Sequence, residues 1–167
     1  MVFVFFQKLR KLNDQFLSVV PKPEDYGLPN DYNFAKNFWG DSFYKLYGPR
    51  SYLEAKALCE SDNATLATPR SDDENAFIAG LISETSIITI WIGVNDIDEN
   101  NKWISVSDGR EVNYTNWNKD EPSGKDWRGR EENGVEIYRP GFHRLGGLWN
   151  DQEITARNKF ICLYDIE

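Results

Sequence analysis

The sequence predicts an α+β fold with antiparallel sheets, and three observations lead to that prediction. Two segments with helical periodicity come early, at residues 51–62 and 71–82. Short segments with strand character follow, most of them between residues 88 and 165. The segments do not alternate as strand, helix, strand, which a parallel sheet with crossover helices would require. We therefore expect two helices, antiparallel sheets and a long irregular region between the late strands.

The first twenty residues carry a helical pattern of their own. Their apolar residues are spaced alternately three and four apart, which is heptad spacing: Val2, Phe5, Leu9, Leu12, Phe16 and Val19. We expect a short amphipathic helix over residues 1–20, although fewer than three heptads are marginal for a coiled coil. It is either a neck that forms a homo-oligomer through residues 2–19, or a helix that packs on its own domain, or a damaged leader. Three prolines then predict a linker and entry segment over residues 21–42.

A compact domain is expected over residues 43–167, and its first elements are a strand and the two helices. The segment 42–47 (SFYKLY) has strand character. The helix over residues 51–62 places Tyr52, Ala55, Leu58 and Cys59 on one face. The helix over residues 71–82 begins with Ser71 three residues before Glu74, which is typical of a capping box.

The remaining elements are expected to be strands. Residues 88–96 (ITIWIGVND) predict a buried strand. Residues 102–117 predict a strand, a turn at Asp108-Gly109 and a second strand. Three more short strands are expected at 134–138, 147–151 and 159–165.

The composition limits the classes of function. With 167 residues, 40% of them hydrophobic and 14% aromatic, the chain can build a folded core. The net charge of −8 and the pI of about 4.8 argue against a nucleic-acid partner, because phosphates require a basic face. No run of 18 apolar residues predicts a membrane span. The two cysteines, Cys59 and Cys162, are either one disulfide or two buried thiols.

The stretch from residue 121 to residue 151 is rich in carboxylates and side-chain amides and is broken by glycines. Its only histidine, His143, is also the only one in the chain, and no set of serine or cysteine stands beside it. We therefore do not expect an enzyme. Oxygen ligands in such numbers are typical of a site for a hard cation.

The chain from about Phe43 to Asp165 resembles the C-type lectin domain. The motifs that carry the resemblance are Ala55 with Cys59, Trp91-Ile92-Gly93, Glu121-Pro122-Ser123, Trp149-Asn150-Asp151 and Phe160-Ile161-Cys162. The resemblance implies the C-type lectin-like fold, with a long irregular ligand-binding loop region. It also implies a disulfide between Cys59 and Cys162, and thus a secreted or extracellular protein. The sequons at Asn63 and Asn113 are compatible with that location.

The resemblance also implies a calcium site. Calcium takes six to eight oxygen ligands at about 2.3–2.6 Å. Carried over residue by residue, the ligands are Glu121, Ser123, Glu132, Asn150 and Asp151. Ser123 departs from the family pattern, which has Asn or Asp there, and Pro122 resembles the family's cis-proline. A second calcium site is not expected, because Asn100 and Gly124 stand where acids are common, although Asp96 matches.

The function implied is calcium-dependent binding of carbohydrate, through the same five residues and Trp127. The partners would be glycans or glycoproteins on cell or microbial surfaces, as in innate recognition. Glu121 favours mannose or fucose, Ser123 relaxes that preference, and Trp127 is either a loop anchor or a platform for galactose. The alternative is a lectin-like fold that binds a protein or mineral surface without sugar recognition.

Two further departures from the family concern the same loop region. The family's second disulfide is missing, because its positions read Gly134 and Ile154. The stretch between those positions carries the basic residues Arg139, His143 and Arg144. The two arginines are expected to be solvated or to favour sulfated or acidic glycans.

Overall fold

The computed structural model describes residues 34–36, 42–83, 85–98, 102–142 and 146–165. Residues Asn33–Glu167 form one compact unit. The predicted helix over residues 1–20, and with it the predicted neck, lies outside the described residues. The segment expected as a linker ends with a short strand, β1 (Phe34–Lys36), which pairs with the first strand of the domain.

The described residues contain two helices and eight strands. The helices are α2 (Tyr52–Ser61) and α3 (Asp72–Gly80). The strands after β1 are β2 (Ser42–Arg50), β3 (Thr65–Leu66), β4 (Thr89–Asn95), β5 (Ile104–Ser105), β6 (Gly134–Tyr138), β7 (Trp149–Gln152) and β8 (Asn158–Asp165). Both expected helices and the α+β class are therefore confirmed.

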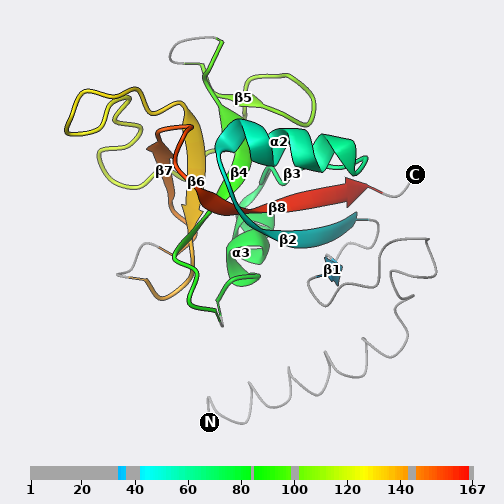
Figure 1. The fold of residues 1–167 in the computed structure, drawn as a ribbon. Helices are drawn as coiled ribbons and strands as arrows, with labels where there is room; N and C mark the ends of the chain where they lie inside the picture. The colour runs from blue at the N-terminus through cyan, green and yellow to red at the C-terminus, as the bar shows by residue number, and fades with distance from the viewer. Residues whose placement is uncertain (1–33, 37–41, 84, 99–101, 143–145, 166–167) are drawn as a thin grey trace, which may run out of the picture. The chain divides into compact units, whose positions relative to one another are not determined.

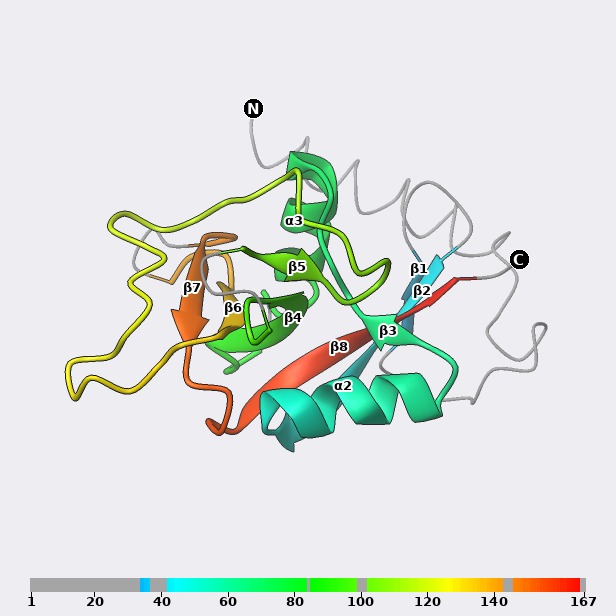
Figure 2. The same cartoon turned by 90° about the horizontal axis from the view of Figure 1, so that it is seen from above.

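The strands form one sheet in the order β1-β2-β8-β4-β6-β7, with β3 on β8 and β5 on β4. Every pair is antiparallel except β4 with β8, which run parallel. The expectation of purely antiparallel pairing is thus corrected at one place, because β8 returns to the middle of the sheet between β2 and β4. Figures 1 and 2 show α2 and α3 on opposite sides of β8.

The prediction of a second strand within residues 102–117 is wrong. After β5 the chain turns at Gly109, whose φ is +68°, and makes only isolated bridges at Glu111 and Trp117. Val112, Tyr114 and Trp117 of this segment pack against the core as an irregular loop. Their strand-like residue types therefore reflect burial beside the sheet and not a ladder within it.

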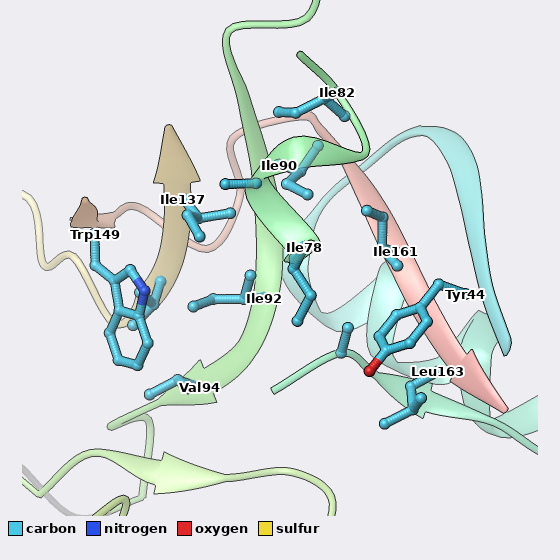
Figure 3. Packing of buried hydrophobic residues seen from close by; sticks show 13 residues of the cluster. Tyr44, Ile78, Ile82, Ile90, Ile92, Val94, Ile137, Trp149, Ile161 and Leu163 are labelled. Carbon is cyan, nitrogen blue, oxygen red and sulfur yellow. The ribbon is translucent and has the colours of Figure 1, made fainter. Parts of the chain in front are cut away.

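The core lies between the sheet and α3, and it reaches the C-terminal motifs (Figure 3). Ile90, Ile92 and Val94 of β4 and Ile137 of β6 are fully buried. Trp149 of β7 packs among them and is also fully buried. The core thereby fixes one end of β7, the strand that carries Asn150 and Asp151.

The glycine of the Trp91-Ile92-Gly93 motif is required by close packing. A Cβ atom at position 93 would lie 2.4 Å from the carbonyl oxygen of Leu66 and 2.4 Å from Thr68 Oγ1. The Gly93 N–H donates to the carbonyl of Ala67. The segment that follows β3 can lie this close to β4 because no side chain stands between them.

The disulfide implied by the family resemblance is present. Cys59 of α2 and Cys162 of β8 are bonded and fully buried, and 103 residues separate them in sequence. In the described part of the chain, no helix is long and apolar enough to span a membrane.

Candidate functional site

The candidate site lies where the irregular segment between β5 and β6 returns to the β6–β7 end of the sheet (Figures 1 and 2). The Glu121–Pro122 peptide bond is cis, as the family resemblance implied. Directly after it, the backbone N–H groups of Ser123 and Gly124 donate to the two carboxylate oxygens of Asp151, at 3.0 and 2.6 Å. Asp151, which is fully buried, thereby joins the turn after Pro122 to strand β7.

Glu132 connects to the same turn from the other side. Its Oε2 atom accepts a hydrogen bond from Ser123 Oγ at 3.1 Å, and its backbone N–H donates to the carbonyl of Gly124. Ser123 Oγ also lies 3.5 Å from Asp151 Oδ1. The hydroxyl of Ser123 therefore lies between two carboxylates that the sequence separates by 19 residues.

Asn150 presents its side-chain nitrogen to two acceptors. Nδ2 donates to the Asp151 carbonyl at 2.6 Å and to Glu136 Oε1 at 3.3 Å. Because both contacts use the nitrogen, the side-chain oxygen remains as a ligand atom. Asn150 is half-buried, so the oxygen is within reach of solvent or a cation.

Glu121 completes the acidic cluster. One of its oxygens, Oε2, is buried without a hydrogen-bond partner. Burial, reinforced by the neighbouring Asp151 carboxylate, raises the pKa of Glu121 to about 7. Burial also raises the pKa of Glu132 above its ordinary value. The nearby Arg130 guanidinium offsets only part of the effect of burial on the pKa of Glu132.

These pKa shifts predict how the stability of the calcium-free protein depends on pH. The pKa of Glu121 is about 7 in the folded state and 4.5 without the fold, so the folded state holds the proton more tightly. The stability that this provides is complete below pH 4.5 and is lost as the pH rises through 7. In chelator, the thermal unfolding temperature should therefore decrease as the pH is raised from 5 to 7.5. Glu121→Gln should make that decrease smaller. A midpoint that rises over the same interval in both proteins would contradict the prediction.

The donor chemistry of the cluster fits calcium. Three carboxylates, one amide oxygen and one hydroxyl are hard oxygen ligands, and the buried oxygen of Glu121 has no other partner. Their placement is not that of an assembled metal centre, however, because no three acidic, histidine or cysteine side chains in the described residues gather closely enough to hold an ion. The Asp151 carboxylate, for example, has both its oxygens engaged by the Ser123 and Gly124 N–H groups.

Trp127 lies outside this cluster, at the tip of an ordered loop. Asp126 Oδ1 accepts from the backbone N–H groups of Arg128 and Arg130, and a bridge joins Lys125 to Glu131. The Trp127 side chain is 83% exposed, and the Arg128 guanidinium lies 4.3 Å from its ring centroid. Of the two roles considered for Trp127, the exposed platform fits this geometry and the anchor does not.

The structure also describes Asp96 and Arg139, two residues for which the sequence led to expectations. Asp96, the one match to a second calcium site, accepts a hydrogen bond from Asn133 Nδ2 at 2.9 Å, whereas Asn100 lies outside the described residues. Arg139 was expected to be solvated or to favour sulfated or acidic glycans; it is half-buried and donates to the carbonyl of Thr85 at 3.0 Å. His143 and Arg144 lie outside the described residues.

Two residues that support the site, Asn75 and Glu136, were not predicted from the sequence. Asn75 of α3 accepts from Trp149 Nε1 at 2.7 Å and donates to the carbonyl of Gly147 at 2.8 Å. Glu136 of β6 is buried and contacts Asn150. Each is a polar residue within an apolar pattern, and that exception to the pattern is the signal that could have identified them.

An apolar contact occupies the positions of the missing second disulfide. A Cβ atom at Gly134 would lie 2.9 Å from the ring of Tyr52 and 3.4 Å from Ile154 Cγ2. The backbone N–H of Tyr52 donates to the carbonyl of Ile154. Tyr52 and Ile154 thus fill the space beside Gly134 and leave little room there for a larger residue.

The comparisons with known proteins agree with this fold. The family model of the lectin C-type domain matches residues 48–164. Collectin-10 of Gallus gallus is 31% identical over 120 residues, which are 72% of this chain and 40% of that protein. The tetranectin-like protein of Carcharhinus perezii is 31% identical over 119 residues, which are 70% of this chain and 66% of that protein.

Among solved structures, the carbohydrate-recognition domain of the mouse scavenger receptor C-type lectin superposes with a TM-score of 0.67. It is 27% identical, and the match covers 81% of this chain and 96% of that domain. The chain spans about 40% of the length of the collectin-10 proteins that it matches. The matching family consists of binding proteins and not of enzymes, which confirms the expectation that this domain is not catalytic. The fold, the disulfide and the family model together show that the chain belongs to the C-type lectin family and contains its carbohydrate-recognition domain.

Proposed function

We propose that the protein binds carbohydrate in a calcium-dependent manner through Glu121, Ser123, Glu132, Asn150 and Asp151. The main support is the cluster itself. Hydrogen bonds from Ser123 and Gly124 join the turn after Pro122 to Glu132 and Asp151, and a buried oxygen of Glu121 has no other partner. A cation would neutralise carboxylates that otherwise repel one another.

The calcium ion, when bound, would supply coordination positions that two vicinal sugar hydroxyls can occupy. The chain's own residues would set the hydrogen bonds to those hydroxyls. Carboxylates of Glu121 and Glu132 would accept from them, whereas the Asn150 nitrogen already donates to the Asp151 carbonyl and to Glu136, which leaves the Asn150 oxygen for the cation. The hydroxyl of Ser123 can do either.

A single site of this kind is small, and its affinity for one sugar should be on the order of millimolar. Useful binding would then come from several sites, and the helix predicted over residues 2–19 would supply them by joining copies of the chain. Sedimentation of the full chain and of a form that begins at Tyr32 tests that assembly, and a monomer in both cases would exclude it.

The proposed location is outside the cell, because disulfides persist in oxidising compartments.

Retention on immobilised mannose and galactose tests the function directly. We expect retention in millimolar calcium and release by chelator. Glu132→Gln should abolish retention, and Glu131→Gln is the matched control, because Glu131 is the exposed neighbour that pairs with Lys125 at 2.7 Å. Retention that survives chelator would contradict the calcium dependence, whereas no retention on either sugar in calcium would favour the alternative, a lectin-like fold that binds a protein or mineral surface without sugar recognition.

Specificity should lean toward mannose or fucose, with galactose still bound. Ser123→Asn should sharpen the preference for mannose and tighten calcium about fivefold, because a regained hydrogen bond is worth about 1 kcal/mol. Trp127→Ala should lower only galactose binding, since the ring face not covered by Arg128 is available to the apolar face of that sugar. Competition assays with both sugars measure the two effects. If the wild type excludes mannose and Ser123→Asn leaves that unchanged, then Trp127 and its loop determine the preference instead.

A further inference from the structure

Glu136 is a buried acid at the centre of a polar network that crosses four strands. It lies on β6, paired in register with Trp91 of β4 and Asn150 of β7. Its side chain is only 6% exposed, among the apolar residues of the sheet. A buried carboxylate with no cation beside it requires hydrogen-bond donors, and their identity indicates what the residue does.

Asparagine side chains supply those donors from two directions. Glu136 Oε1 accepts from Asn150 Nδ2 at 3.3 Å, and Glu136 Oε2 accepts from Asn158 Nδ2 at 2.5 Å. The far end of the network is closed by Thr89, whose hydroxyl donates to Asn158 Oδ1 at 3.2 Å. The network therefore runs from Thr89 on β4, through Asn158 on β8 and Glu136 on β6, to Asn150 on β7.

A carboxylate imposes a direction on this network. An ionised carboxylate can only accept hydrogen bonds, whereas an amide presents a donor on one side and an acceptor on the other. The atom of Asn150 that faces Glu136 must then be the nitrogen. The Asp151 carbonyl accepts from the same nitrogen at 2.6 Å and imposes the same orientation. The oxygen of Asn150 is consequently turned away from both acceptors.

We propose that Glu136 is a positioning residue that fixes the orientation of the Asn150 amide, so that its oxygen is presented to the bound cation. The inference rests on the proposed function, in which Asn150 is a calcium ligand. Glu136 itself touches neither the cation nor the sugar in this role.

A double-mutant cycle on calcium affinity tests the inference, with calcium alone as the titrant and no sugar present. Glu136→Gln keeps the shape but can offer Asn150 either end of an amide, and it should weaken calcium binding about tenfold, as is usual for residues that orient metal ligands. Asn150→Asp sets two carboxylates face to face and should also weaken binding. In the double variant, the amide introduced on β6 can donate to the carboxylate introduced on β7 and accept from Asn158, so most of the affinity should return.

The single variant Asn150→Asp separates positioning from simple electrostatics. If Glu136 acted only through its negative charge on the cation, the carboxylate added by Asn150→Asp would tighten calcium binding, and the two effects would add without coupling. Glu131→Gln is the matched control, because it also removes one carboxylate near the site. It should leave calcium affinity within about twofold of the wild type, because the Glu131 carboxylate is exposed and pairs with Lys125 at 2.7 Å.

A second readout does not depend on calcium. In chelator, Glu136→Gln should shift the side-chain NH2 resonances of Asn150 in an amide NMR spectrum, whereas Glu131→Gln should leave them nearly unchanged. Additive affinities, or equal effects of Glu136→Gln and Glu131→Gln, would overturn the inference. If the wild type binds no calcium, the proposed function fails and the cation part of the inference fails with it. The Asn150 resonances then decide separately whether Glu136 orients the amide.

Discussion

Asp151→Asn is expected to lower calcium affinity at least a hundredfold and to abolish sugar retention in millimolar calcium. The Asp151 carboxylate is fully buried and accepts from two backbone N–H groups, those of Ser123 and Gly124. The substitution removes a negative charge that the ion would otherwise contact. An interaction with such a charged group, at about 3 kcal/mol, corresponds to roughly a hundredfold in calcium affinity.

The fold should survive this substitution, because Asp151 contacts the loop and not the apolar core. Trp149 and Ile137, which fix the end of β7 that joins the core, are unaffected. Isothermal titration with calcium measures the affinity, and Glu131→Gln controls for the loss of one negative charge near the site. Calcium binding by Asp151→Asn within about threefold of the wild type would show that the cluster is not the metal site.

Removal of the disulfide by the double substitution Cys59→Ala and Cys162→Ala should lower the free energy of unfolding by about 2–5 kcal/mol. The bond closes a loop with a sequence separation of 103 residues, so its loss frees a large part of the unfolded chain. Both sulfur atoms are also buried, between α2 and β8, and their removal leaves a small void.

Urea unfolding of the oxidised wild type and the double variant measures this difference. A loss below about 1 kcal/mol would mean that the packing of α2 on the sheet, and not the bond, provides the stability. Because the bond joins α2 to β8, and the cluster lies between the 121–132 segment and β7, calcium affinity should change little in the double variant.

The sequence alone predicts the parts of this protein that depend on local pattern. The helix predicted over residues 51–62 is present, and three side chains of its predicted apolar face, Tyr52, Ala55 and Cys59, are buried. The fourth, Leu58, is half-buried. The pairing of Cys59 with Cys162 and the cis bond before Pro122 came from the family resemblance, and both are present in the structure. The cluster of Ser123, Glu132 and Asp151 also came from that resemblance, and hydrogen bonds now link its members.

What the sequence could not predict depends on long-range placement. The β-branched and aromatic residues in 110–117 are typical of a strand, but Val112, Tyr114 and Trp117 pack beside the sheet without forming a strand of it. The parallel contact of β4 with β8 depends on where the last strand inserts, which no local pattern records. The role of Glu136 could not be predicted either, because an acid in a short apolar strand can be interpreted only when its partners on β7 and β8 are known.

The contact of Gly134 with Tyr52 and Ile154 has a consequence for the environments in which the protein can work. Both cysteines of the chain are used in one bond that ties a helix to the last strand, so a reducing medium can cut only that connection. The end of the molecule that carries Glu132 and Asp151 is closed by van der Waals contact around Gly134, and thiol reagents do not act on it. The redox potential of the surroundings would therefore alter how long the domain stays folded, whereas temperature and solvent, which act on apolar packing, would govern how firmly the site is held together.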